Sequence, residues 1–275
     1  MAKTKQKIAD CLLRENEPLP YEVFNEQKKS NVLIVCDHAS RVIPKSLGTL
    51  GLKSADRKKH IVWDIGTDDL GRKLSNSLKA PAVIATYSRI VIDLNRDCDD
   101  KECIRSISDH IPVPGNEKLS AKQKKQRFQE IYWPYHGQID VQIDKVIRRG
   151  EVPFLISVHS FTPTIDDIKR PWHISILWHK EQKIAKRVIQ NLRDQNPKLV
   201  IGENKPYCLK KHKMGRFTVE THAEERRMPY VLVEFRQDMV DTPRKAARMA
   251  NIFLKAIKPV LADETIARRR IKKTS

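Results

Sequence analysis

The sequence contains three apolar runs that each lead directly into a polar, chemically active side chain. The runs are NVLIVCDHAS (31–40), VPFLISVHS (152–160) and PYVLVEFRQD (229–238), and their polar residues are His38, His159 and Glu234. Short runs rich in Val, Ile and Leu predict strands that are buried on both faces of a sheet. Ligands of such sheets bind beyond the carboxyl ends of the strands. The three strand ends therefore predict a single functional site.

Segments with helical periodicity lie between these runs. Helices are predicted over residues 60–81, 120–149, 183–195, 216–227 and 243–261, the second with a kink at Pro134. Further strands are predicted over residues 82–88, 90–97, 173–178 and 198–202. Alternating helices and almost wholly apolar strands are typical of an α/β fold in which a mainly parallel sheet is covered on both faces.

No Pro-, Gly- or Ser-rich linker divides the 275 residues, which favours a single domain. We expect an N-terminal lead over 1–29, the folded domain over 30–262 and a basic tail over 263–275. The first residues lack the apolar core of an export signal, and no run of about 18 apolar residues occurs. Together with an odd number of cysteines, these features predict a soluble, cytoplasmic protein with reduced thiols.

The formal net charge of +19 is the strongest compositional bias of the chain. Clustered basic residues attract nucleic acid and other polyanions. Here Lys and Arg are spread over several segments, including AKQKKQR (121–127), LKKHK (209–213) and ARRRIKK (267–273), and no nucleic-acid-binding motif accompanies them. We favour solvated helix faces and a basic tail, and we keep binding of nucleic acid or another anionic polymer as the alternative.

His38 and His159 are candidate metal ligands. One histidine after a buried strand is more often a structural residue, but two such strand ends with carboxylates nearby favour a metal ion. Two imidazoles and a carboxylate make an open zinc site with three protein ligands. We predict Asp64, expected early in a helix, as the third ligand, and His60 as a substitute ligand on the same helix face. The alternative role of Asp64 is that of an acid at a helix N-terminus.

Glu234 ends the third apolar run, and an acid in that position is costly to bury unless it has a partner or a catalytic role. We predict that it acts as a general base, which takes a proton from the attacking water and passes it to the leaving nitrogen. The alternative is a salt bridge to Arg236. Arg236 alternates onto the same strand face, and we predict it as a substrate-binding residue of the same site.

The segment SRIVIDLNRD supplies Arg89, Asn95 and Arg96. Because arginine binds carboxylates through two parallel hydrogen bonds, we predict that these three residues bind an acidic substrate. In isolation they would be ordinary ion pairs at a strand end. Ser160, after the second strand end, and His222, in VETHAEE, are further candidate substrate contacts, and a solvent-facing His222 is the alternative. No Gly-x-Ser-x-Gly motif supports a serine nucleophile.

Seven separated motifs resemble the N-formylglutamate amidohydrolase family. In chain order they are CDHAS..IP..LG, HIVWDIGTDDL, YSRIVIDLNRD, ISVHSFTP, RPWHISILW, IGENKPY and HAEERRMPYVLVEFRQD, over roughly residues 30–255. The resemblance implies a three-layer α/β sandwich with a mainly parallel, mixed sheet, of the phosphorylase/hydrolase-like kind and related to zinc-dependent exopeptidases. The segment KHKMGRFTVETH departs most from the family pattern, with Gly215, Arg216 and Phe217 in place of a glycine–tyrosine motif.

Related zinc-dependent N-acetylmuramoyl-L-alanine amidases have His, Glu and His ligands in this order. By analogy these ligands fall on His38, Asp64 and His159, with Asp in place of Glu, and Glu234 takes the place of the catalytic acid. The Asn95–Arg96 pair resembles the pair that binds the substrate carboxylate in zinc carboxypeptidases. The resemblance therefore implies a zinc-dependent amidohydrolase for a small acidic N-acyl amino acid. N-formyl-L-glutamate is the first candidate substrate, and cell-wall peptides are the alternative.

Overall fold

The computed structural model describes residues 11–209 and 216–272. The strands of its central sheet are β1 (Tyr21–Phe24), β2 (Val32–Cys36), β3 (Ala82–Ala85), β6 (Phe154–Phe161), β9 (Ile174–Leu177), β10 (Ile201–Glu203) and β11 (Tyr230–Arg236). They form a seven-stranded sheet in the order β1-β3-β2-β6-β11-β9-β10. The pairs β1–β3 and β9–β11 are antiparallel, and the other neighbouring strands are parallel. The predicted mainly parallel, mixed sheet is confirmed.

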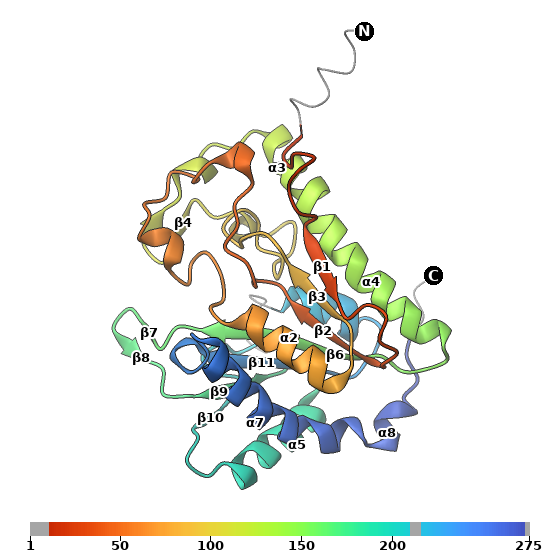
Figure 1. Ribbon diagram of the computed structural model, residues 1–275. Coiled ribbons are helices and arrows are strands. Elements are labelled where there is room, and N and C mark those ends of the chain that lie inside the picture. The colour runs from red at the N-terminus through yellow and green to blue at the C-terminus, as the bar shows by residue number, and fades with distance from the viewer. Residues whose placement is uncertain (1–10, 210–215, 273–275) are drawn as a thin grey trace.

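Helices cover both faces of this sheet. They are α2 (Thr67–Leu78), α3 (Ala121–Arg127), α4 (Trp133–Arg148), α5 (Gln182–Gln195), α6 (Phe217–Val219), α7 (Pro243–Leu261) and α8 (Glu264–Ala267). Helices α2, α5 and α7 pack together on one face, and α4 lies against the other (Figure 1). This helix–sheet–helix order is the predicted three-layer sandwich.

Alternation along each strand allows one sheet to serve two hydrophobic cores. In β2, Val32, Ile34 and Cys36 belong to the core formed with α2, α5 and α7, whereas Leu33 and Val35 belong to the core formed with α4. All five residues are buried. Because both faces are covered, the strand is a continuous apolar run, which is why the sequence predicted it.

The strand predicted over residues 90–97 is wrong. Its four aliphatic residues are buried in the core beside α4, but the segment forms turns. The Val91 amide donates to the Ser88 carbonyl at 3.0 Å, and the Asp93 amide donates to the Cys103 carbonyl at 2.8 Å. Branched apolar residues favour burial as strongly as strand pairing, so composition alone did not distinguish a buried turn from a strand.

Helix α2 begins later than predicted, and Asp64 lies in the loop that precedes it. Gly66, directly before the helix, has a left-handed backbone conformation with φ 84°. A Cβ at this position would lie 2.3 Å from the Val240 carbonyl oxygen. The helical periodicity before Thr67 therefore reflects burial in a loop that only glycine allows to pass so close to the neighbouring segment.

Two helical predictions contain π-helical turns in the structure. The predicted helix over 120–149 is continuous through α3, a π-helical turn at Phe128–Tyr132 and α4. This turn ends two residues before Pro134, which lacks the amide hydrogen that a regular helix needs. The helix predicted over 216–227 is shorter, and consists of α6 and a π-helical turn at Glu220–Glu224.

A buried arginine of α3 holds the loop that carries several site residues. Arg127 is 1% exposed, and its Nη1 donates to the Val91 carbonyl and to Asn116 Oδ1, both at 2.7 Å. Asn116 Nδ2 in turn donates to the carbonyls of Ile90 and Arg105, at 2.8 and 2.7 Å. Burial lowers the pKa of Arg127 to about 10. These contacts fix the loop at the edge of the sheet.

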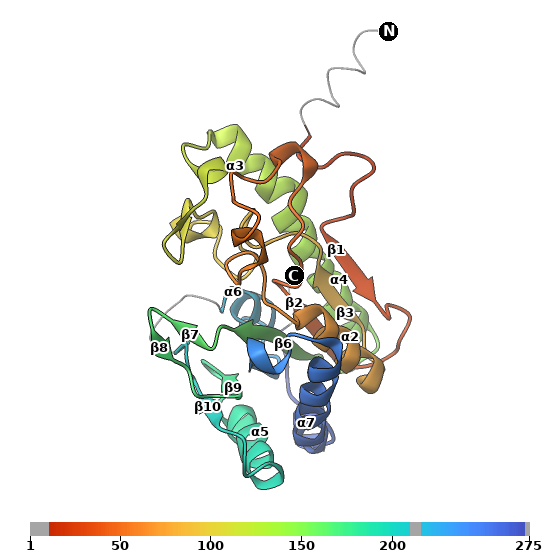
Figure 2. The same ribbon diagram turned by 60° about the vertical axis from the view of Figure 1, so that its left-hand side comes forward.

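Two short hairpins lie on the same side of the molecule (Figure 2). They are formed by β4 (Ile107–Ser108) with β5 (Ile111–Pro112), and by β7 (Thr164–Ile165) with β8 (Ile168–Lys169). Their turns meet where His110 Nε2 lies 3.0 Å from Asp166 Oδ1.

Parts of the predicted lead and tail belong to the folded domain. β1 lies within residues 1–29 and pairs with β3, and Ile266 of α8 packs into the core. Residues 1–10 of the lead and 273–275 of the tail lie outside the described residues. So do residues 210–213 of the basic segment LKKHK, and Gly215. In the described chain, no helix combines the length and apolarity that a membrane crossing requires.

Candidate active site

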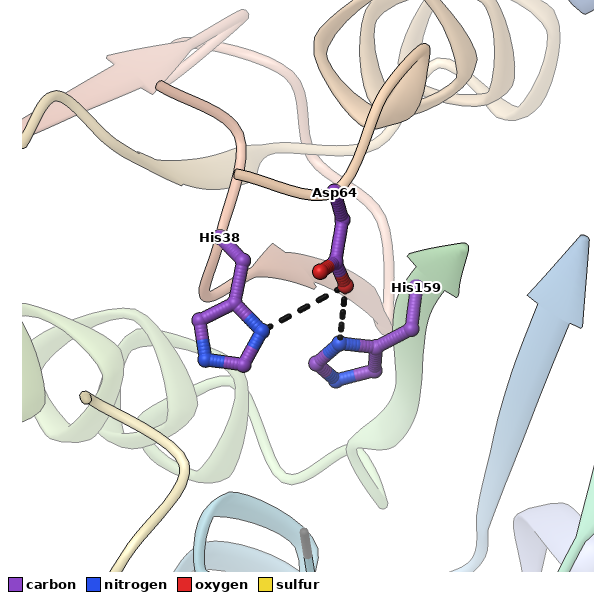
Figure 3. Close-up of side chains that lie close together, drawn as sticks. All are labelled: His38, Asp64 and His159. Atoms are coloured by element: carbon purple, nitrogen blue, oxygen red, sulfur yellow. Dashed lines mark hydrogen bonds and ion pairs between the residues drawn. The ribbon is translucent and has the colours of Figure 1, made fainter. Parts of the chain in front are cut away.

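Two histidines and one aspartate converge at the carboxyl ends of β2 and β6 (Figure 3). His38 follows β2, Asp64 lies in the loop before α2, and His159 is part of β6. The Nδ1 atoms of His38 and His159 lie 3.3 and 3.0 Å from the same oxygen, Asp64 Oδ2. All three side chains are buried, and the two imidazole centroids are 5.1 Å apart. The structure thus brings the three predicted ligands to one point.

A carboxylate lies behind each imidazole, on the side away from Asp64. His38 Nε2 lies 2.7 Å from Asp93 Oδ1, and His159 Nε2 lies 3.3 Å from Asp37 Oδ2. The Asp37 contact is an ion pair, and the hydrogen-bond acceptor next to His159 Nε2 is Ser157 Oγ at 3.1 Å. An acceptor at Nε2, which is Asp93 for His38 and Ser157 for His159, holds the proton there and leaves the Nδ1 lone pair free, which is how metal-binding histidines are usually oriented. The sequence showed Asp37 and Asp93 only as acids near the candidate residues, with no signal that paired either with an imidazole.

The spacing of the three side chains fits a tetrahedral zinc ion. With metal–ligand distances of about 2.0–2.1 Å, the ligand atoms of such an ion lie about 3.3 Å apart. The 3.3 and 3.0 Å distances from Asp64 Oδ2 to the two Nδ1 atoms match this value. One ligand atom from each residue lies within 4.8 Å of the other two. Two imidazole nitrogens and one carboxylate oxygen are also a donor set that zinc commonly has.

Mutual charge interactions set the protonation of this cluster. Burial raises the pKa of Asp64, but His38, Arg89 and His159 lower it far below its ordinary value. Burial lowers the pKa of His159, but Asp37 and Asp64 raise it well above its ordinary value. The cluster is therefore an ionised carboxylate between imidazoles that attract protons. A divalent cation replaces such protons when it binds.

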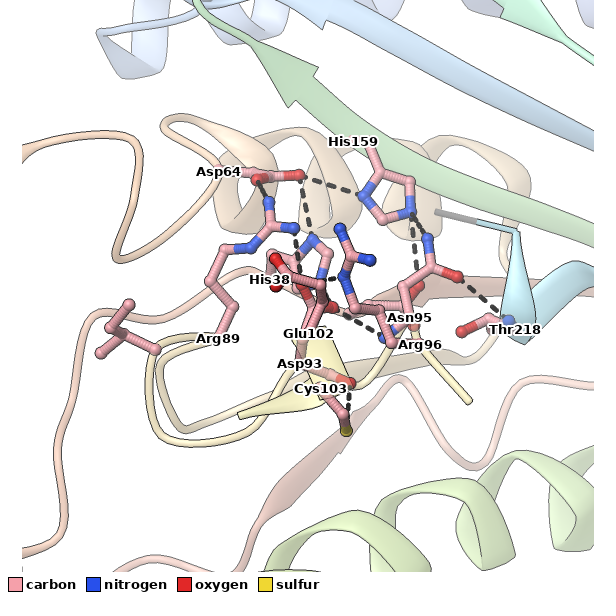
Figure 4. A network of polar contacts seen from close by, with 12 residues as sticks. His38, Asp64, Arg89, Asp93, Asn95, Arg96, Glu102, Cys103, His159 and Thr218 are labelled. Carbon is pink, nitrogen blue, oxygen red and sulfur yellow. Dashed lines mark hydrogen bonds and ion pairs between the residues drawn. The ribbon is translucent and has the colours of Figure 1, made fainter. Parts of the chain in front are cut away.

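Arg89 bridges two carboxylates of the site. Its Nη1 donates to Asp64 Oδ1 at 2.9 Å and its Nη2 donates to Asp93 Oδ2 at 2.7 Å (Figure 4). Arg96 Nη1 donates to Asp100 Oδ2 at 3.0 Å. Both arginines line the cavity at the site, but protein carboxylates already engage them. In the structure they hold the acids of the site in position.

Glu234 lies beside His159, its register partner in the neighbouring strand. Its side chain is 7% exposed, and within the described residues its Oε2 has no hydrogen-bond partner. Burial raises the pKa of Glu234 to about 7; Asp64 adds to this rise and His159 opposes it. A carboxyl group with such a pKa accepts and releases a proton readily near neutral pH.

These groups line a cavity of about 250 Å³. Pockets for drug-sized ligands measure roughly 300–1,000 Å³, so this cavity suits a small molecule. Its lining includes most predicted site residues, namely His38, Asp64, Arg89, Asn95, Arg96, His159, Ser160 and Glu234. His60 also lines it, but its Nε2 lies 3.4 Å from Asp109 Oδ2 and it is not part of the three-residue cluster.

Asn95 and Ser160 contact the candidate metal ligands. Asn95 Nδ2 lies 3.3 Å from His159 Nε2. The Ser160 amide donates to Asp64 Oδ2 at 3.3 Å, and its hydroxyl donates to the Ile65 carbonyl at 2.8 Å. Both side chains line the cavity, and the Ser160 amide also holds Asp64 in position.

The predictions for His222 and Arg236 need correction, because neither lines the cavity. His222 is 1% exposed; its Nδ1 lies 2.7 Å from Asp140 Oδ1 and its Nε2 lies 2.9 Å from His136 Nδ1. The π-helical turn that carries it packs this side chain against α4. Arg236 Nε donates to Asp238 Oδ1 at 2.7 Å. Its guanidinium is therefore bound at the end of β11 by a residue only two positions away.

Besides Asp37 and Asp93, further residues of the site were not predicted from the sequence. The Tyr135 hydroxyl of α4 donates to Asp37 Oδ1 at 2.7 Å, over 98 positions in sequence. Arg105 and Tyr207 line the cavity. Apolar periodicity placed Tyr135 on the buried face of its helix, but nothing in the sequence paired it with Asp37. Arg105 and Tyr207 lie in loops without a periodic pattern.

The sequence profile of the N-formylglutamate amidohydrolase family matches residues 30–240. This chain belongs to that family. A curated N-formylglutamate deformylase from Pseudomonas putida is 30% identical over 110 residues, which are 35% of this chain and 41% of that protein. Membership confirms the resemblance seen in the seven motifs, and it supports an enzyme that hydrolyses amides.

Solved structures have the same fold. A gene product of Agrobacterium tumefaciens has a TM-score of 0.85 and 28% identity, covering 90% of this chain and 99% of that one. An N-formylglutamate amidohydrolase from Ralstonia eutropha JMP134 has a TM-score of 0.64 and 17% identity, covering 93% of this chain and 96% of that one. The second likeness concerns the fold alone.

Proposed function

We propose that this chain is a metal-dependent amidohydrolase that cleaves the amide bond of a small acidic N-acyl amino acid. N-formyl-L-glutamate, which yields formate and L-glutamate, is the first candidate, supported by the family and by the curated relative. The observation that carries the proposal is the convergence of His38 and His159 Nδ1 on Asp64 Oδ2, at 3.3 and 3.0 Å, beside the buried Glu234. The cavity of about 250 Å³ supports a single acyl amino acid as substrate.

His38, Asp64 and His159 would hold one divalent cation, and their donor set makes zinc the first candidate. When bound, such an ion supplies Lewis-acid polarisation of the scissile carbonyl and acidifies water. Asp93 and Asp37 lie behind the two imidazoles, at 2.7 and 3.3 Å from their Nε2 atoms, and Ser157 Oγ lies 3.1 Å from Nε2 of His159. The imidazoles therefore need no rearrangement to present Nδ1 to a cation.

Glu234 transfers the proton. Its carboxylate takes a proton from the attacking water as oxygen bonds to the acyl carbon, and it gives that proton to the nitrogen as the carbon–nitrogen bond breaks. The amine then leaves in neutral form. The pKa of about 7 for Glu234 suits both halves of this transfer.

Two substitutions test the proposal. Glu234→Gln should keep the metal and lower kcat about 10²–10⁴-fold, because proton transfer is lost. His159→Ala should lose both metal and turnover. His173→Ala is the control, since this partly buried histidine belongs to none of the candidate metal-binding groups of the described chain. Metal content by mass spectrometry and formate release from N-formyl-L-glutamate measure the outcome. Wild-type turnover in Glu234→Gln would exclude the general-base role, and one equivalent of zinc in His159→Ala would remove His159 from the ligands.

The alternatives have separate tests. The net charge of +19 supports binding of nucleic acid or another anionic polymer, and a DNA titration at several salt concentrations tests this. Parallel assays with N-formyl, N-acetyl and muramyl peptide substrates distinguish an amino-acid deformylase from a cell-wall amidase. The cytoplasmic location stays a prediction.

A further inference from the structure

Three arginines line the candidate active-site cavity, and they differ in what they contact. Arg89 donates to Asp64 and Asp93, at 2.9 and 2.7 Å, and Arg96 donates to Asp100 at 3.0 Å. These two guanidinium groups are therefore bound by carboxylates of the protein itself. The third, Arg105, lies in the loop between Cys103 and β4 and also faces the cavity.

Arg105 differs in that the protein leaves its terminal guanidinium nitrogens available as hydrogen-bond donors. Its Nε lies 3.2 Å from Glu102 Oε2, and the Glu102 side chain is 59% exposed, where an ion pair contributes little. In residues 11–209 and 216–272, its two terminal nitrogens have no hydrogen-bond or ion-pair partner. The side chain of Arg105 is 23% exposed and lines the cavity, so these donors are accessible to a ligand there. Two parallel N–H groups in this state fit a carboxylate, which binds both of them at once.

The backbone of Arg105 is held firmly in place. Asn116 Nδ2 donates to the Arg105 carbonyl at 2.7 Å, and Asn116 Oδ1 accepts from the buried Arg127 at 2.7 Å. The side chain itself contributes nothing to this anchor. A guanidinium on a fixed backbone recognises an anion with a smaller loss of conformational freedom than one on a mobile loop.

Arg105 lines the cavity but is not one of the three side chains that converge where the amide would be cleaved. Burial lowers the pKa of Arg105. Asp93 and Glu102 raise this pKa, and the nearby Arg89 and Arg96 lower it. Asp93 sits at Nε2 of His38, on the opposite side of the imidazole from Asp64. Arg105 pairs with Glu102 and with none of His38, Asp64 and His159, so a ligand group that meets Arg105 binds beside the three converging side chains rather than among them.

An acidic side chain also borders this part of the cavity, but it has a partner. Asp109 lines the wall next to Ser108, and its Oδ2 lies 3.4 Å from His60 Nε2. Asp109 is therefore directed to His60. No carboxylate of the described chain other than the exposed Glu102 pairs with Arg105.

We propose that Arg105 binds the side-chain carboxylate of the acyl amino acid and so selects acidic substrates. This inference rests on the proposed function and specifies its substrate. The α-carboxylate is joined to the same carbon as the scissile nitrogen, so it must stay near the reacting amide. The side-chain carboxylate of a glutamate-like substrate is separated from that amide by more bonds, so it is the group that can reach an arginine outside the three converging side chains.

The experiment compares two substrates and two product ligands that differ only in charge. The full-length protein and its variants are titrated calorimetrically with L-glutamate and with L-glutamine, and kcat and KM are measured with N-formyl-L-glutamate and N-formyl-L-glutamine. The variants are Arg105→Ala and Arg105→Lys. Lys101→Ala is the matched control, because Lys101 is an exposed cation of the same loop that does not line the cavity.

Arg105→Ala should weaken glutamate binding and raise the KM for N-formyl-L-glutamate about 10–100-fold, with kcat and the glutamine values changed less than about twofold. Arg105→Lys, which keeps the charge and loses the paired donors, should fall between wild type and Arg105→Ala. Lys101→Ala should match wild type. Urea unfolding of all variants should coincide, because the Arg105 side chain contacts only the exposed Glu102.

The outcomes separate this inference from the proposed function. Wild-type protein that binds glutamate selectively through Arg105 but cleaves neither formyl substrate would overturn the activity and retain the anchor. Cleavage of both formyl substrates with equal kcat/KM would overturn the anchor and retain the activity. An equal loss for glutamate and glutamine in Arg105→Ala would also refute the anchor, as would a wild-type protein that binds neither ligand.

Discussion

Replacing Tyr135 by Phe removes one hydroxyl from a line of contacts that ends at the candidate metal site. The Tyr135 hydroxyl donates to Asp37 Oδ1 at 2.7 Å, and the other oxygen of Asp37 lies 3.3 Å from His159 Nε2. Asp37 is fully buried. Burial raises its pKa, but His159, His38 and Tyr135 together lower it below its ordinary value. Without the hydroxyl, the carboxylate behind His159 loses a hydrogen bond that water does not replace.

The expected magnitude follows from the charge of the acceptor. A hydrogen bond to a charged group contributes roughly 1.5–3 kcal/mol, so Tyr135→Phe should lower the free energy of unfolding by about 2 kcal/mol. Loss of a partner that orients a metal-ligating histidine typically lowers metal affinity or activity by about 10–100-fold. Because Asp37 itself remains beside His159, we expect the lower end, about tenfold.

The control is Tyr87→Phe, another buried tyrosine whose hydroxyl donates to a neutral acceptor, the Pro18 carbonyl, at 2.8 Å. This variant should lose about 1 kcal/mol of stability and keep wild-type zinc affinity. Urea unfolding of the metal-free proteins and competition with a chromogenic zinc chelator measure the two quantities. Wild-type zinc affinity in Tyr135→Phe, or an equal fall in both variants, would refute the argument that Asp37 orients His159 through this contact.

Two further predictions concern stability. A Cβ at Gly71 in α2 would lie 2.6 Å from Cys36 Sγ, whereas a Cβ at Gly137 in α4 meets nothing within 4 Å. Gly71→Ala should therefore destabilise the protein by about 1–2 kcal/mol through overpacking, and Gly137→Ala should stabilise it by up to about 1 kcal/mol through helix propensity; the same sign for both in urea unfolding would contradict this reasoning. Burial raises the pKa of Glu224, but its hydrogen bonds, first that from His179, lower it below the ordinary 4.5. Ionised Glu224 thus stabilises the fold above about pH 4.5 and loses this effect as the pH falls through its lowered pKa. The stability difference between wild type and Glu224→Gln should shrink from about pH 6 to about pH 3, and a constant difference would show that the group is not linked to folding.

Much of the fold could be predicted because burial leaves a direct record in residue type. β2, β6 and β11 are covered on both faces, so each is a continuous apolar run, and the polar residue that ends it is conspicuous. The same rule failed at residues 90–97, where aliphatic side chains are buried in turns rather than in a ladder. Hydrophobicity indicates that a segment is buried. Whether the segment forms a strand depends on its backbone hydrogen-bond partners, which come from elsewhere in the chain.

The candidate site was predicted less evenly. Asp64 was predicted in a helix, but the left-handed conformation of Gly66 places the start of α2 after it, so Asp64 lies in a loop. From this loop its carboxylate contacts both histidines. His222 was expected near the cavity mouth or in solvent, and it is instead buried against α4. Arg236 shares a strand with Glu234 but turns to Asp238. Side-chain direction at the end of a strand depends on neighbours that no short sequence pattern specifies.

The amino-acid sequence alone determined which segments enter the core and that His38, His159 and Glu234 stand at their ends, because the free energy of burying apolar surface depends on residue type. Only the tertiary structure decided which imidazole nitrogen faces Asp64, which acids stand behind the rings and which arginine keeps free donors. His38 meets Asp93 over 55 positions and Asp37 meets Tyr135 over 98. Contacts at such separations are set by the order in which strands pair and helices pack, and hydrogen bonds and charges are sensitive to the resulting distances at the scale of one ångström.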